Sequence, residues 1–166
     1  MGEEREEREE RGRVGACASF RAGDDAVYAL PLAALVEVRR VPPLTRVPGT
    51  RAPLAGVGNW RGRVLAVLDL GPLLGGGQVP PGRRSRLLVC RVTPPGRVTA
   101  VEFGLLAGTV LAVGSQPLEL APLLPSVPPA RAALLAGQAL VAGELVGVLD
   151  PAALAGLAGT VLVEAA

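Results

Sequence analysis

The sequence of 166 residues contains neither histidine nor lysine. Without histidine, the chain cannot build a Ser-His-Asp or Cys-His nucleophilic system, and it lacks the commonest zinc ligand. Without lysine, it has no Walker A phosphate loop and no amine for a Schiff base. These absences lead us to expect a protein that is not an enzyme and that uses no cofactor and no metal.

Aromatic residues make up only 2% of the chain, and the formal net charge is only +2. The chain therefore has few aromatic side chains on which nucleic-acid bases could stack, and its net charge by itself does not indicate nucleic-acid binding. We expect no nucleic-acid partner. A nucleic-acid-binding β-barrel is nevertheless the alternative function, because Arg61, Arg63, Arg83, Arg84 and Arg86 could line one face, and steep salt dependence would support it.

Long hydrophobic runs are also missing, since no apolar stretch reaches the roughly 18–20 residues that span a bilayer. Residues 3–11 alternate glutamate pairs with arginine, which is unlike a signal peptide. We therefore expect a cytoplasmic protein without membrane insertion, whose charged residues 1–13 form a disordered tail. Cys17 and Cys90 lie among small and apolar residues, which is typical of buried thiols.

From Val14 onward, short apolar segments alternate with turn residues. Proline-rich stretches at 42–53 and 117–131 cannot lie inside central strands and predict long loops. Asp150 followed by Pro151 predicts the start of a helix. Many short strands at regular spacing favour an all-β barrel architecture with short capping helices. The expected strands are 16–21, 26–32, 63–70, 86–93, 97–103, 109–113 and 144–149. Residues 35–41 are expected to form either a further strand or a short helix leading into one.

An internal repeat appears at an offset of 81 residues, because 54–56, 62 and 67–69 are identical to 135–137, 143 and 148–150. We infer two homologous small barrels, the first mainly at 14–75 and the second mainly at 84–150. Residues 151–166 are expected to pack back on them. Because domains of about 60 residues are marginally stable alone, the two barrels should share an apolar face.

The repeat places Asp69 and Asp150 at equivalent positions in the two halves. Paired aspartates from duplicated β lobes are how aspartic proteases build a proton-sharing dyad. Asp69 is followed by Leu-Gly and Asp150 by Pro-Ala, and neither sequence supplies the hydroxyl and glycine turn of such a site. The sequence favours a second interpretation, in which each aspartate caps the turn or helix after its strand.

The two copies differ most where the first has Asn59-Trp60-Arg61 and the second has Leu140-Val141-Ala142. Tryptophan and arginine are the residues most enriched in binding hot spots, so this segment, interpreted as a loop, is the candidate interaction site. The alternative roles are structural. Trp60 could fill a gap between barrels, Arg61 could bond a neighbouring carbonyl or carboxylate, and Asn59 and Gly62 could serve the turn.

The segment Gly56–Leu70 resembles the signature of CheW-like domains, which runs Gly, aliphatic, any residue, Asn, any residue, Arg-Gly, and then an aliphatic strand ending in Asp-Leu. Upstream, Tyr28–Leu32 and Val36-Glu37-Val38 are similar to the family's second strand and its neighbourhood. The resemblance covers roughly 16–154 and is most specific at 26–70. It implies two five-stranded SH3-like barrels side by side.

The resemblance further implies an adaptor for chemotaxis or motility signalling. Its partners would be the regulatory domain of a CheA-type histidine kinase and the cytoplasmic tip of methyl-accepting chemoreceptors, so the protein would be recruited to receptor arrays. Ala66 and Ala100–Gly104 depart from the family pattern, which suggests a changed second barrel and a pathway such as pilus-driven motility. The expected partner-binding residues are Val36, Glu37, Asn59, Trp60, Arg61 and Gly62.

Overall fold

The computed structural model describes residues 12–23, 25–50 and 52–165. The segment 1–11, where most of the charged tail was expected, lies outside the described residues. Arg13, which was assigned to that tail, belongs instead to strand β1 (Arg13–Val14), which pairs antiparallel with β10 (Leu118–Glu119). This pairing places Arg13 opposite Glu119 and Val14 opposite Leu118. A positive charge therefore faces a negative one, and an apolar side chain faces another apolar side chain.

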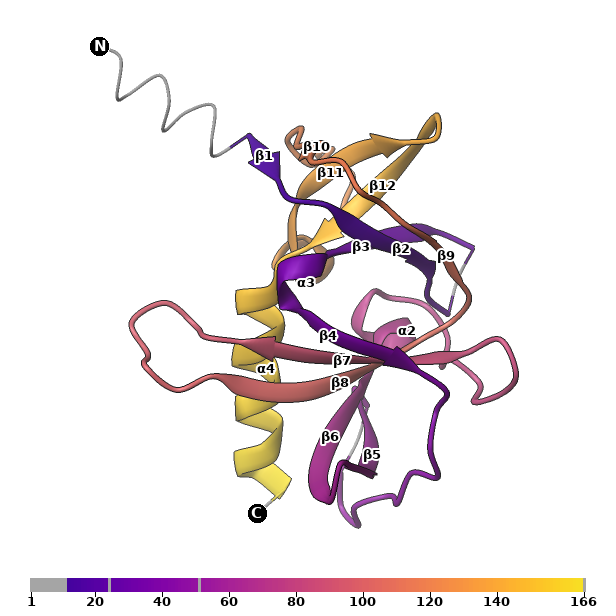
Figure 1. Cartoon of the computed structure of the whole chain (residues 1–166), viewed down its shortest axis with the longest axis vertical. Coiled ribbons are helices and arrows are strands. Elements are labelled where there is room, and N and C mark those ends of the chain that lie inside the picture. The colour runs from indigo at the N-terminus through magenta and orange to yellow at the C-terminus, as the bar shows by residue number, and fades with distance from the viewer. Residues whose placement is uncertain (1–11, 24, 51, 166) are drawn as a thin grey trace.

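Two five-stranded sheets form the body of the molecule (Figure 1), which confirms the all-β fold class. Sheet 1 has the strand order β4 (Leu35–Arg39), β7 (Arg86–Val92), β8 (Val101–Ala107), β6 (Arg63–Asp69) and β5 (Leu54–Trp60). Sheet 2 has the order β9 (Val110–Val113), β2 (Cys17–Arg21), β3 (Val27–Pro31), β12 (Glu144–Leu149) and β11 (Leu135–Val141).

The two sheets match strand by strand, but they divide the chain differently from the expected halves 14–75 and 84–150. Each sheet joins the first hairpin of one repeat, β2–β3 or β7–β8, to the last three strands of the other. The exchange follows from short connections, because only the three residues of η1 (Leu32–Ala34) separate β3 from β4, and only residues 108–109 separate β8 from β9. The chain therefore passes straight into the other sheet. The hairpin β7–β8 joins sheet 1 through the parallel pair β6–β8, and the hairpin β2–β3 joins sheet 2 through the parallel pair β12–β3.

Strands β5 and β11 lie where the sequence indicated loops and are the largest error of the prediction. The two strands were missed because Gly56 and Gly137 interrupt the alternation of apolar residues that indicates a strand. Both glycines sit at a β-bulge, and a Cβ would lie 2.6 Å from the carbonyl oxygen of Thr45 at Gly56 and 2.9 Å from that of Ala121 at Gly137. The repeat therefore keeps glycine where a loop backbone lies directly against the strand.

Each of these strands continues through a two-residue turn into the next strand. Arg61 and Gly62 have φ of 49° and 75°, and Ala142 and Gly143 have φ of 49° and 81°. Positive φ at both central residues defines the type I′ turn, whose twist matches that of the flanking strands. The glycine shared by the repeat at 62 and 143 thus belongs to a tight hairpin turn.

Alternating side chains on the strands build three apolar clusters. Phe20, Leu30, Leu88 and Phe103 belong to the cluster between the sheets, and smaller clusters lie on the opposite faces of sheet 1 and sheet 2. Both cysteines are buried, as expected, and burial raises the pKa of Cys17 to about 11 and that of Cys90 to about 12. Neither thiol is therefore poised to react.

Three α-helices complete the described chain: α2 (Leu70–Leu73), α3 (Pro129–Ala132) and α4 (Pro151–Ala165). Helix α4 has fifteen residues and is longer than the short caps that the sequence suggested. It crosses β7 and β8 (Figure 1) and adds Leu154, Ala155 and Ala158 to the cluster between the sheets. Strand β8 also begins later than predicted, at Val101 instead of Arg97.

The two repeat-related aspartates cap the helices that follow their strands. Asp69 accepts hydrogen bonds from the backbone N–H of Gly71 at 2.9 Å and from that of Val79 at 3.1 Å, whereas Asp150 accepts one from Ala152 at 3.0 Å. Burial raises the pKa of Asp69, although its backbone hydrogen bonds act in the opposite direction. The capping interpretation is confirmed for both residues.

We expect Asp69→Ala to destabilise the protein by roughly 2–3 kcal/mol, because it leaves two buried N–H groups without an acceptor. The repeat supplies the matched control, since Asp150→Ala removes a single cap and should cost about 1 kcal/mol. Urea unfolding of both variants measures the difference. Equal losses would contradict the larger role assigned to Asp69.

The turn of the β11–β12 hairpin requires a glycine because of its backbone conformation. A Cβ at Gly143 would meet no atom within 4 Å, so Gly143→Ala should destabilise through backbone strain alone, by about 1–2 kcal/mol. Gly156 in α4 has equally open surroundings, but its backbone is helical, a conformation in which alanine is favoured over glycine. Gly156→Ala should therefore stabilise the protein by about 0.5–1 kcal/mol. Thermal unfolding should therefore show shifts of opposite sign, and shifts of the same sign would contradict this account.

Candidate functional site

The candidate site lies where the two edges of sheet 1 meet. Glu37 is on edge strand β4 and Trp60 ends the opposite edge strand β5, yet the indole Nε1 donates a hydrogen bond to Glu37 Oε2 at 3.0 Å. Sheet 1 must curl to bring its first and last strands this close. The bond therefore links the two edges of the sheet through one buried aromatic ring and one carboxylate.

Two arginines cover Trp60. The guanidinium of Arg61 lies 4.9 Å from the centre of the indole ring, and that of Arg63 lies 5.4 Å from it. Cations at such distances are attracted by the ring's negative face. Trp60 is only 1% exposed, so it presents almost no surface to a partner and instead holds its neighbours in place. Its burial favours the structural role for Trp60 that the sequence left open, namely packing beneath its neighbours.

Arg61 forms the exposed part of the site. Its guanidinium lies 3.3 Å from Glu37 Oε2, and its side chain remains 63% exposed. The type I′ turn fixes its backbone in the left-handed region, with φ at 49°. Arg61 is therefore held by the turn, the ring and the carboxylate while its surface stays accessible.

A second charged group, which the sequence did not reveal, flanks the same ring. Glu102 on β8 forms ion pairs with Arg63 at 2.7 Å and with Arg91 at 2.9 Å. Arg91 and Glu102 are directly opposite each other on β7 and β8. Because strand β8 was expected at 97–103, the sequence did not place Glu102 beside these arginines.

The remaining predicted residues have separate roles. Asn59 accepts a hydrogen bond from the backbone N–H of Gly62 at 3.1 Å and so closes the turn. Val36 lies at a β-bulge of β4 and is exposed, as is Val38. Val64, which the sequence did not single out, pairs across the hairpin with Asn59 and is 79% exposed. The site thus combines a charged pair with apolar side chains on β4 and β6.

The electrostatics of the site favour an ionised Glu37. The hydrogen bond from Trp60 lowers the pKa of Glu37, and the charges of Arg61 and Arg39 lower it further, while desolvation acts against them. Within the described residues, no group of three or more Asp, Glu, Cys or His side chains is arranged to hold a metal ion. The arrangement suits recognition of another protein through a fixed charge pair and exposed valines.

Comparison with known proteins agrees with this arrangement. The family model of the CheW-like domain matches residues 16–158. Protein FrzA from Myxococcus xanthus is 37% identical over 106 residues, which cover 64% of this chain and 61% of that protein, so the match spans less than two thirds of the relative. The crystal structure of scaffolding protein TtCheW from Thermoanaerobacter tengcongensis has a TM-score of 0.66 at 23% identity, over 82% of this chain and 89% of that one.

The curled five-stranded sheets and the Gly-x-x-Asn-x-Arg-Gly hairpin define a double SH3-like domain. This chain belongs to the family of CheW-like domains. None of the helices in the described part of the chain is long and apolar enough to cross a membrane.

The lowered pKa of Glu37 predicts a pH-dependent contribution to stability. Its carboxylate is favoured in the folded state, so the stabilisation is complete above its usual pKa of 4.5 and is lost as the pH falls through the lowered value. Glu37→Gln keeps an acceptor for Trp60 but removes the charge. We expect the wild type to be more stable than this variant at pH 7 and the two to converge in acid.

Urea unfolding between pH 7 and pH 3 measures this convergence. Glu144→Gln on the second hairpin removes the same charge outside the site and serves as the control. If the difference between the wild type and Glu37→Gln stayed constant over that range, the contacts of Trp60 and Arg61 with the Glu37 carboxylate would not be stabilising.

Proposed function

We propose that this protein is a non-catalytic adaptor that couples methyl-accepting chemoreceptors to a CheA-type histidine kinase in chemotaxis or motility signalling. Membership of the CheW-like family supports the adaptor role. The observation that carries the proposal is the exposed Arg61–Glu37 pair, which Trp60 contacts where the two edges of sheet 1 approach each other. A charge pair fixed in this way can be recognised with little loss of side-chain entropy on binding.

The proposed mechanism is assembly. Holding a kinase beside a receptor raises their effective concentration and restricts their relative orientation, without any bond being made or broken. The regulatory domain of the kinase and the cytoplasmic tip of the receptor are the proposed partners, and receptor arrays are the proposed location. An adaptor of this kind must offer surfaces that stay ordered when partners exchange.

The proposed contact surface consists of Val36, Glu37, Arg61 and Val64, with Asn59 and Gly62 shaping the turn that presents Arg61. Val36 and Val64 offer exposed apolar area, and Arg61 offers a planar cation. Aromatic and arginine anchors surrounded by apolar contacts are typical of binding hot spots. In this surface the tryptophan acts beneath the arginine and positions it.

The nucleic-acid alternative gains no support from the placement of its arginines. Arg61 and Arg63 are engaged by Glu37 and Glu102, which places carboxylates beside two of the five proposed phosphate ligands. Arg86 donates to the backbone carbonyl oxygens of Arg83 and Ser85. A phosphate-binding face needs cations that are free of such partners.

Charge reversal tests the proposal. We expect Arg61→Glu and Glu37→Arg each to weaken binding of a receptor-tip fragment or of the kinase regulatory domain by roughly tenfold or more, because each places like charges together and removes a recognised group. Isothermal titration calorimetry with both fragments measures the change. Combining the two substitutions restores opposite charges and should recover part of the affinity.

Arg97→Glu, in the exposed loop between β7 and β8, is the matched control for charge. It should bind both fragments like the wild type. A folded wild-type protein that binds neither fragment, or single variants that bind as tightly as the wild type, would contradict the coupling function assigned to this site.

A further inference from the structure

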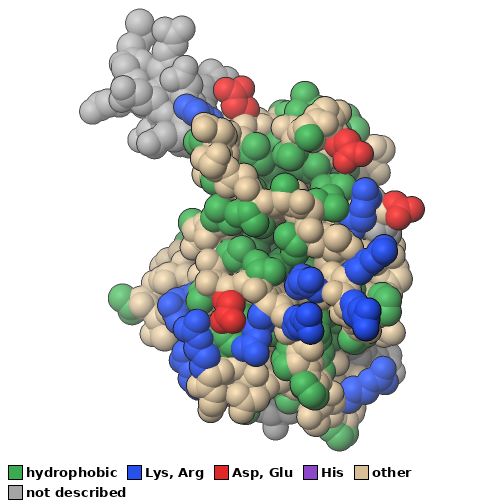
Figure 2. Space-filling model, turned by 45° about the vertical axis from the view of Figure 1, so that its right-hand side comes forward, with side chains coloured by type: hydrophobic (Ala, Val, Ile, Leu, Met, Phe, Trp, Pro, Cys, Tyr) green, Lys and Arg blue, Asp and Glu red, His purple; other side chains and the backbone are tan. Residues whose placement is uncertain are grey.

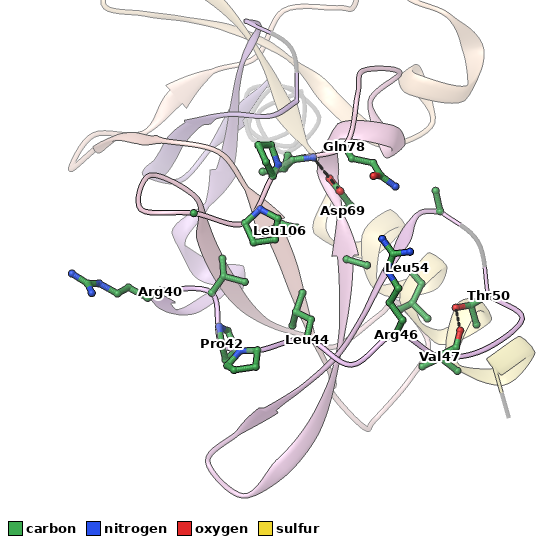
Figure 3. Close-up of a pocket in the computed structure, with 18 of the residues that line it drawn as sticks. Arg40, Pro42, Leu44, Arg46, Val47, Thr50, Leu54, Asp69, Gln78 and Leu106 are labelled. Carbon is green, nitrogen blue, oxygen red and sulfur yellow. Dashed lines mark hydrogen bonds between the residues drawn. The ribbon is translucent and has the colours of Figure 1, made fainter.

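A groove of about 1240 Å³ opens on sheet 1, away from the Glu37–Arg61 pair. One wall is formed by residues within 40–50 and by Ala52, the other is the segment 78–83, and β5, β6 and β8 supply the floor (Figure 3). Each wall contains two consecutive prolines, at 42–43 and at 80–81. The volume exceeds the roughly 300–1,000 Å³ of most small-molecule pockets, so the groove has room for a peptide segment.

The floor of the groove holds two leucines beside the buried carboxylate of Asp69, and it adjoins the apolar cluster that contains Trp60. Leu54 and Leu106 line it, and Val41 and Leu44 from the loop pack against the buried cluster that contains Trp60. None of the lining residues that the structure describes is aromatic. The groove therefore offers apolar contact but no platform on which nucleic-acid bases could stack.

The charges around the groove are strongly biased. Residues 35–107, which include all of sheet 1, contain eleven arginines and three acidic residues, so this part of the chain carries +8 while the whole chain carries +2. Basic side chains gather on the lower half of the molecule in Figure 2, with apolar side chains between them. A field of this kind attracts acidic partners and orients them on approach.

Three arginines line the groove, and in the described part of the chain none of them takes part in an ion pair. Arg46 extends into the groove and Arg40 points outward at one end (Figure 3). Arg83, at the end of the segment 78–83, is the third lining arginine. Asp69 is the only acidic residue among the described lining residues; it is 6% exposed, and both of its oxygens already accept backbone hydrogen bonds. The cations are therefore available to an external anion.

We propose that this groove binds an extended acidic peptide segment of a partner protein, with apolar side chains on the floor and carboxylates at Arg46 and Arg83. The leucines of the floor and the prolines of the walls suit an extended peptide, and the uncompensated arginines select a negatively charged one. The site is distinct from the Glu37–Arg61 surface, so the proposal does not depend on the coupling function.

Binding can be followed by the fluorescence of Trp60, because it is the only tryptophan in the chain and the groove residues Val41 and Leu44 pack against the cluster that contains it. The probe is a blocked synthetic peptide, Glu-Glu-Leu-Pro-Glu-Leu-Glu-Glu, titrated into the full chain while Trp60 fluorescence is followed. Two control peptides replace every glutamate by lysine or every leucine by glycine. We expect saturable binding of the first peptide only.

Variants locate the binding. Arg46→Glu combined with Arg83→Glu should weaken binding of the acidic peptide roughly tenfold or more, whereas Arg97→Glu together with Arg13→Glu makes the same charge change outside the groove and should leave binding nearly unchanged. Thermal unfolding confirms that each variant is folded. Direct calorimetry replaces fluorescence if Trp60 does not respond.

Three results would overturn the proposal. The acidic peptide could fail to bind the wild type, it could bind the groove variant as tightly as the wild type, or the glycine-substituted peptide could bind equally well. A fourth result would assign the groove to nucleic acid instead. In that case the wild type would bind single-stranded oligothymidylate more tightly than the acidic peptide, and the groove variant would lose this binding. None of these results depends on the kinase or receptor fragments used to test the coupling function.

Discussion

The hydrogen bond between Trp60 and Glu37 connects the two edge strands of sheet 1, and the exposed charged site depends on it. Edge strands ordinarily carry unpaired backbone groups and side chains that are free to move. Here one edge supplies the acceptor and the other supplies the ring, and two guanidinium groups lie over that ring. Because the ring is buried, the carboxylate and Arg61 are held at a defined position on the surface of the domain.

The exchange of hairpins between the sheets explains why the two halves form one unit. A hairpin alone is only marginally stable, so β2–β3 and β7–β8 must join the three strands of the other repeat to complete a five-stranded sheet. The inner faces then share one apolar cluster, which α4 covers with Leu154, Ala155 and Ala158. Neither repeat can therefore unfold without removing strands from both sheets.

The duplicated scaffold has diverged in chemistry. The hairpin of sheet 1 carries Trp60 and Arg61, whereas the corresponding hairpin of sheet 2 exposes Leu140 and Leu145 next to Glu144. Most of the positive charge also lies on the segment that builds sheet 1. Identical bulges and identical type I′ turns thus present a polar, basic surface on one side of the molecule and an apolar hairpin on the other.

The sequence alone determined the features that arise from local chemistry and from the repeat. It indicated the all-β class, the turn glycines at 62 and 143, and the capping aspartates at 69 and 150, because turn geometry and helix capping act within a few residues. Only the tertiary structure decided the exchange of hairpins, the strands β5 and β11, the burial of Trp60 and the ion pairs of Glu102. These features depend on contacts between segments distant in the chain, such as Glu37 with Trp60, and on a loop backbone lying against Gly56. No local pattern of residues contains that information.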